Sequence, residues 1–329
     1  MYLDKLEILK KLREFSKVKT ALLPRDIDFC INDKVLKIFV HYPSQNMQTN
    51  NASFEAWAIA LKYWLKDEIE QVELDFQLRE GHEFGNVRSE GGHYNRFLYR
   101  LFSMTRFFQD WFSVCIDKKD QISKFMDWAR VSSLLINASD IERDSRIISQ
   151  NKERQVESWF VYHEGRELLL RRWAIESRKL FNQLPVGVFV NEVKRQNAVF
   201  THGASAIDIW GIGEDHQTFH LIELKAGRNY SLGVISETLF YGALVYDTYL
   251  SREPLFCLNE VSKEKARSDY LAIQEARKAL QYLRLHILAE HFHPLFSEGL
   301  VALINSGLNP FGIDLDCVLY SYFERKLVD

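Results

Sequence analysis

Residues 204–225 read ASAIDIWGIGEDHQTFHLIELK and decide the fold more than any other stretch of the chain. Two apolar runs flank a turn that is rich in glycine and acidic residues. This pattern predicts two neighbouring strands joined as a hairpin. Side chains alternate between the two faces of a strand. Glu223 and Lys225 should therefore project from one face, while Leu224 packs on the other.

The charged residues of this stretch point to a chemistry. Burying Asp208, Glu223 and Lys225 among apolar neighbours is costly unless they pair or bind an ion. Two carboxylates, with a carbonyl and waters, suit Mg²⁺. Such an ion polarises a phosphoryl oxygen and lowers the pKa of a bound water, and a lysine alongside can orient or deprotonate that water. These residue types indicate phosphodiester hydrolysis.

The elements around this stretch follow from helical and strand periodicity. We expect a long helix from about 156 to 184, a strand at 188–193, the two strands of the quoted stretch, and a helix at 231–250. The apolar positions of that last helix, among them Leu232, Ile235 and Leu239, recur at helical spacing.

Asp208, followed after fourteen residues by Glu223-Leu224-Lys225, resembles the PD-(D/E)XK nuclease superfamily. The resemblance covers about residues 150–250 and implies the restriction-endonuclease-like fold, an α/β (α+β overall) mixed sheet flanked by helices. In that family a helix precedes three hairpin-linked strands, the aspartate lies on the second strand and the E-x-K on the third, and a second helix packs behind. Ile207 stands where the family name has proline.

The resemblance also implies roles for individual residues. Asp208, Glu223 and the backbone carbonyl of Leu224 would bind the metal, Mg²⁺ or alternatively Mn²⁺, and Lys225 would position or activate the attacking water. Many members add a glutamate from the first helix. Glu167 is our choice for it, and the competing candidates are Glu164 and Glu157.

Basic side chains near the motif are candidates for contacts with nucleic-acid phosphates. Arg228, just past Lys225, is the best placed, and Arg171 and Lys194 are further candidates. For the last two the competing interpretation is a solvated surface, because long basic side chains routinely coat exposed helices. DNA is the expected substrate and RNA the alternative. A homodimer or a regulatory protein partner stays open.

The rest of the chain predicts a separate N-terminal α+β domain of unassigned role, residues 1–148, before a nuclease-like domain, residues 149–329. The boundary lies where charged residues replace apolar ones. The N-terminal elements expected are a helix within 1–20, a hairpin of strands 27–31 and 35–40, a helix at 53–66, a strand at 71–76 and a helix at 94–114. The C-terminal ones are a long helix within 260–297 and strands at 300–305 and 313–322.

Composition limits the alternatives. The net charge of -3 gives no global attraction to nucleic acid, although a local basic cleft could still bind it. Four widely spaced cysteines form no CxxC pair, so buried free thiols are expected rather than a zinc ribbon. No signal core or long apolar run is present, which predicts a cytoplasmic protein without a membrane partner. The main alternative to an enzyme is an inactive nuclease fold that binds nucleic acid or serves as a scaffold.

Overall fold

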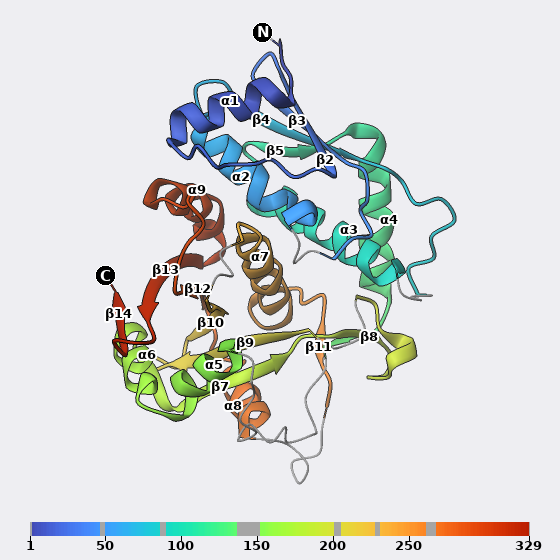
Figure 1. The fold of residues 1–329 in the computed structure, drawn as a ribbon. Coiled ribbons are helices and arrows are strands. Elements are labelled where there is room, and N and C mark those ends of the chain that lie inside the picture. Colours follow the sequence, from blue (N-terminus) through green and yellow to red (C-terminus); the bar gives the residue numbers. More distant parts are fainter. Residues whose placement is uncertain are drawn as a thin grey trace.

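The chain pairs its strands into three sheets within the residues that the computed structural model describes, which are 2–46, 50–85, 90–136, 152–200, 205–227, 231–260 and 268–328. The two larger sheets come from the N-terminal and C-terminal parts of the chain, and the small one joins them (Figure 1). Helices pack on the sheets, so the protein is a mixed α/β protein.

The N-terminal sheet has the strand order β1-β2-β3-β4-β5. Strands β2 and β3 form the expected hairpin, whereas β3, β4 and β5 run parallel. Parallel neighbours need crossover connections, which helices supply here. The strands are β1 (Tyr2–Leu3), β2 (Ile27–Asn32), β3 (Val35–Val40), β4 (Gln71–Phe76) and β5 (Phe112–Val114). The helices are α1 (Lys5–Ser16), α2 (Phe54–Trp64), α3 (Glu90–Phe107) and α4 (Ile116–Val131).

The C-terminal sheet has the order β14-β13-β12-β10-β9-β7. Its strands β7, β9 and β10 are antiparallel, and β10, β12 and β13 are parallel. The strands are β7 (Ile175–Pro185), β9 (Ala206–Gly213), β10 (Thr218–Lys225), β12 (Tyr282–Ala289), β13 (Ile313–Ser321) and β14 (Lys326–Val328). The helices are α5 (Lys152–Tyr162), α6 (Gly165–Trp173), α7 (Val234–Val245), α8 (Ser268–Ala276) and α9 (Glu298–Leu308).

Helices cover both faces of the C-terminal sheet. On one face α5 and α6 pack against the even-numbered side chains of β10, such as Ile222 and Leu224. On the other face α7 packs over the odd-numbered ones, such as Leu221. Every residue of α7 is buried, because this helix lies between the sheet and the N-terminal helices α2 and α3 (Figure 1).

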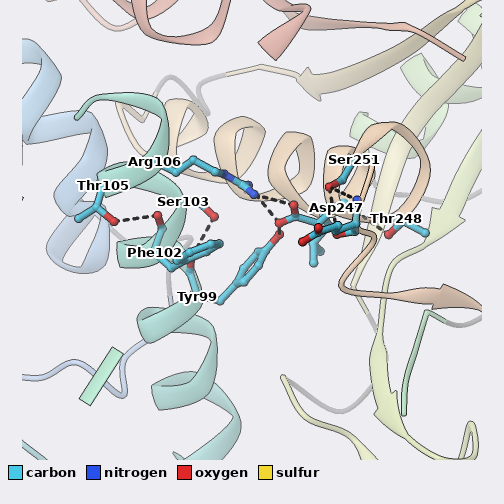
Figure 2. Close-up of polar contacts among 10 residues, drawn as sticks. Tyr99, Phe102, Ser103, Thr105, Arg106, Asp247, Thr248 and Ser251 are labelled. Atoms are coloured by element: carbon cyan, nitrogen blue, oxygen red, sulfur yellow. Dashed lines mark hydrogen bonds and ion pairs between the residues drawn. The ribbon is translucent and has the colours of Figure 1, made fainter. Parts of the chain in front are cut away.

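The two parts of the chain share one hydrophobic cluster. The small sheet also joins them, since β6 (Leu134–Ile136) pairs with β8 (Val188–Val190) and β11 (Cys257–Leu258). Figure 2 shows a third connection, in which Asp247, in the π-helical turn Tyr246–Leu250 after α7, accepts hydrogen bonds from Tyr99 and Arg106 of α3. The expected boundary at 148/149 lies outside the described residues, and the cores on its two sides are continuous.

Several expected elements differ from the structure. The helix expected at 156–184 is two shorter helices followed by β7, the true first strand of the sheet, and the strand expected at 188–193 belongs to the small sheet as β8. Helix α6 begins at Gly165, where any larger residue would place a Cβ against the Trp159 ring. It ends before Ala174, whose backbone is in the left-handed conformation. Residues of β7 on both sides of an irregularity between Ile175 and Leu180 pair with β9, and this pairing overrides the helical pattern.

Three further elements, and the burial of the cysteines, also differ from what the sequence predicted. The region expected as one helix, 260–297, contains α8 and then β12, whose buried apolar run cannot be distinguished from a helix by periodicity. The strand expected at 300–305 is α9, capped by the Ser297 hydroxyl. Helix α3 ends at Phe107, and β5 occupies the end of the helix expected at 94–114. The cysteines are free, but none is fully buried and Cys257 is exposed.

Candidate functional site

The predicted motif lies on the neighbouring strands β9 and β10. These strands pair Ile209 with Ile222, and the backbone N–H of Leu224 donates to Oδ2 of Asp208 at 3.0 Å. Asp208 is thereby held beside the residues that flank Leu224. The structure thus brings together the aspartate, the glutamate and the lysine that the sequence predicted.

Lys225 lies at the centre of a group of carboxylates. Its Nζ is 2.7 Å from Oε1 of Glu223, 3.1 Å from Oε2 of Glu237 and 3.8 Å from Oε1 of Glu153. Glu223 and Glu237 are 2% and 5% exposed. Glu237 comes from the first turn of α7 and Glu153 from the first turn of α5. Two helices and one strand therefore supply the carboxylates around a single ammonium group.

The structure changes which glutamate, among those expected on the first helix, lies near the motif. Glu157 on α5 is buried and accepts hydrogen bonds from Asn182 at 2.6 Å and Gln183 at 2.8 Å. Its charge acts on the same site, since Asp208 is among the groups that raise its pKa. Glu167, our sequence-based choice, is instead exposed on α6 and faces Arg171 at 4.0 Å. The break at Gly165 places it on a different helix.

Burial and mutual repulsion set the protonation of the group. Burial raises the pKa of Asp208, against the lowering effects of Lys225 and the Leu224 N–H. Burial, together with Asp208 and Glu237, raises the pKa of Glu223 well above its ordinary value. Burial raises the pKa of Glu157 to about 7. Burial alone would lower the pKa of Lys225, but the surrounding carboxylates raise it well above its ordinary value.

This charge balance favours a further cation. One ammonium group faces several carboxyl groups, and Oε2 of Glu223 is buried and accepts no hydrogen bond in the described structure. A proton shared between Asp208 and Glu223, or a cation, relieves their repulsion. A buried carboxylate oxygen without a donor is costly, and a hard divalent cation is the kind of partner that relieves this cost. Asp208 and Glu223 provide oxygen atoms of the chemistry that Mg²⁺ prefers.

Three metal-ligating side chains also lie together in the N-terminal part of the chain. Within the described ranges, Asp75, Cys115 and Asp117 are the group of three whose ligand atoms all lie within 4.8 Å of one another. Lys118 lies 3.6 Å from Asp75 and 2.7 Å from Asp117, so an ammonium already partners these acids. In the group around Asp208, the Lys225 ammonium lies among the carboxylates.

The predicted phosphate-contacting residues lie apart from this group or outside the described residues. Arg171 has an 84% exposed side chain on α6, and Lys194 pairs with Glu192 at 2.5 Å. Both agree with the solvated-surface interpretation. Arg228 lies outside the described residues.

A buried histidine pair was not expected from the sequence. His286 lies in β12, within the region expected as one helix, and its Nε2 is 3.0 Å from Nδ1 of His220. Trp173 stacks on His286 with ring centroids 3.9 Å apart and donates to Asp316 at 3.1 Å. His220 and Glu223 have opposite parity on β10, so this pair is not part of the motif group.

Sequence reasoning missed Glu237 and Glu153. The sequence did predict a helix behind the motif at α7. Glu237 is the one charged residue in that mostly apolar helix, and a lone charge in a buried segment was a usable signal of a functional residue. Glu153 lies among the charged residues close to the expected domain boundary and carried no such signal.

Comparison with protein-family models, curated proteins and solved structures finds no significant match to this chain. Over the described residues, the helices fall short of the length and apolarity that a membrane crossing requires.

Proposed function

We propose that this protein is a metal-dependent nuclease that hydrolyses phosphodiester bonds, with DNA as its substrate. The observation that carries the proposal is the convergence of Asp208, Glu223 and Lys225 on two adjacent strands, with one buried oxygen of Glu223 lacking a donor. A magnesium ion bound there would polarise the phosphoryl oxygen and acidify a bound water.

The order of elements supports the restriction-endonuclease-like fold that the resemblance implies. Helix α5 precedes the antiparallel strands β7, β9 and β10, and α7 packs behind them. Asp208 lies on the second of these strands, and Glu223 and Lys225 lie on the third. This is the arrangement expected from the motif, with β7 in place of the strand expected at 188–193.

Each residue then has a role that its surroundings permit. Asp208 and Glu223 would bind the cation, with the Leu224 carbonyl as a further ligand. Glu157, oriented by two amide donors from β7, takes the position that the sequence had assigned to Glu167. Lys225 would orient the attacking water and stabilise the charge that develops on the phosphate.

A direct test is cleavage of linear double-stranded DNA, single-stranded DNA and RNA in Mg²⁺, Mn²⁺ or EDTA. The variants are Asp208→Ala and Lys225→Ala. Glu324→Gln, at an exposed carboxylate paired with Lys326, is the matched control. We expect metal-dependent cleavage that both site variants lose and the control keeps. Cleavage that persists in Asp208→Ala, or in EDTA, would contradict the proposed site.

The second candidate is a nuclease fold that binds nucleic acid without cutting it. The observation that favours it is that Lys225 is already paired with Glu223, one of the two carboxylates that would hold the metal. Under this proposal the protein retains a labelled DNA duplex in EDTA and leaves it intact in Mg²⁺ and in Mn²⁺. Cleavage that requires the metal would exclude it.

A further inference from the structure

Glu237 is the least expected member of the group around Lys225. It lies in the first turn of α7, where Oε2 is 3.1 Å from the Lys225 ammonium. Helix α7 is buried along its whole length, and its N-terminal turn is tied to α2 by the hydrogen bond from the Ala56 N–H to the Ser236 hydroxyl. The packing of α7 therefore fixes the position of Glu237 relative to Lys225.

Lys225 divides its charge between two carboxylates that are not equivalent. Glu223 holds the ammonium through Oε1 and has a second buried oxygen without a donor. Glu237 contacts the same ammonium from α7 rather than from the strand. Glu223 belongs to the predicted metal ligands, whereas Glu237 does not.

A divalent cation and the ammonium would compete for Glu223. Two cations about 4 Å apart repel each other by about 1 kcal/mol per pair of unit charges in water and by more where solvent is excluded. When Glu223 coordinates a cation, Lys225 must give up its contact with Glu223. It can stay in the site only if another carboxylate holds it there.

We propose that Glu237 is a positioning residue that retains the Lys225 ammonium inside the site when Glu223 binds a divalent cation. This inference rests on the proposed function and assigns a role that the motif does not contain. Lys225 thereby gives up its contact with Glu223, keeps the one with Glu237 and stays close to the metal-bound water. Glu153, at 3.8 Å, is the more distant of the two helix carboxylates and is 31% exposed.

The decisive measurement is a crystal structure of the full chain soaked in Mn²⁺, located by its anomalous scattering. We expect Mn²⁺ at Asp208 and Glu223, with Lys225 Nζ within hydrogen-bond distance of Glu237 and no longer of Glu223. Direct coordination of Mn²⁺ by Glu237 would overturn the inference, as would a Lys225 side chain that has left Glu237. Absence of Mn²⁺ beside Asp208 would overturn both this inference and the metal site of the proposed function.

Kinetics of the variants add an independent readout. We expect Glu237→Gln to lower kcat by at least about tenfold with KM changed by less than about twofold, because displacing an ammonium that orients the water and stabilises the developing charge costs rate rather than binding. Glu237→Asp, which keeps the charge, should recover part of the loss. Glu55→Gln removes a different buried ion pair, with Arg100, and controls for lost stability.

The Glu55→Gln variant separates a positioning role of Glu237 from a purely structural one. If Glu55→Gln and Glu237→Gln lose kcat equally at a temperature where both are folded, Glu237 has only a structural role and the inference fails. If wild-type protein cuts no substrate, the proposed function fails, and the position of Lys225 in the Mn²⁺ soak still decides the role of Glu237.

Discussion

Substitution of Asp247 by asparagine tests how the N-terminal helices are held to α7 (Figure 2). The carboxylate accepts from Arg106 Nη1 at 2.6 Å, from Arg106 Nη2 at 3.0 Å and from the Tyr99 hydroxyl at 2.6 Å. The Asp247 side chain is 4% exposed and that of Arg106 is 20% exposed. Asparagine fits the space but leaves the Arg106 guanidinium largely buried without its counter-ion. Breaking a buried ion pair in this way costs about 3–5 kcal/mol.

Two further variants calibrate this value. Tyr99→Phe removes one hydrogen bond to a charged acceptor and should cost about 1.5–3 kcal/mol, less than Asp247→Asn. The double variant Asp247→Leu with Arg106→Met removes both charges and should be more stable than Asp247→Asn, because no buried charge is left alone.

The free energy of unfolding is measured by urea titration at pH 7, followed by tryptophan fluorescence and circular dichroism. If fluorescence and circular dichroism give coincident transitions and the m-value is unchanged, unfolding is two-state and the free energies of the variants can be compared. A loss below about 1 kcal/mol for Asp247→Asn would refute the reasoning, since that is the range of exposed pairs. A double variant less stable than Asp247→Asn would also refute it.

Three further predictions concern the site, the histidine pair and the packing of α9. Glu157→Gln should weaken Mn²⁺ binding measured by calorimetry by about ten- to a hundredfold. Glu167→Gln should leave it within about twofold, and equal losses would contradict the assignment of Glu157. Burial lowers the pKa of His286, and burial together with His286 lowers that of His220 to about 3. At these two histidines the unfolded chain binds protons that the folded chain does not, so the contribution of the pair to stability should fall below about pH 6.5 by up to about 1.4 kcal/mol per pH unit for each group. In urea titrations between pH 7 and pH 5, the stability of wild-type protein relative to that of His220→Asn should decrease as the pH falls, and a difference that does not change with pH would count against this explanation. Gly307→Ala places a Cβ 2.5 Å from the Phe108 ring and 2.6 Å from the Phe107 carbonyl, so it should cost about 1–3 kcal/mol in thermal or urea unfolding, and a neutral result would show that α9 can shift.

Local patterns explain why part of the fold could be predicted. The hairpin of β2 and β3 and the pair β9 and β10 have strand periodicity and clear turn residues, and both pairs are antiparallel neighbours in the structure. The segments that were mispredicted lacked such signals. Strand β7 carries charged residues that favour a helix equally well, and β12 is buried on both faces from His286 to Ala289 because helices cover both sides of the sheet.

The sequence by itself determined the pair of strands that carries Asp208, Glu223 and Lys225, because the alternation of side chains along a strand is a local property. Only the tertiary structure decided which other carboxylates join them. Glu157 rather than Glu167 lies with the group because of where α5 ends, and Glu237 faces Lys225 because α7 is wedged between the sheet and the N-terminal helices. The rotation and crossing of packed helices depend on the shapes of side chains distant in sequence, and no local pattern encodes them.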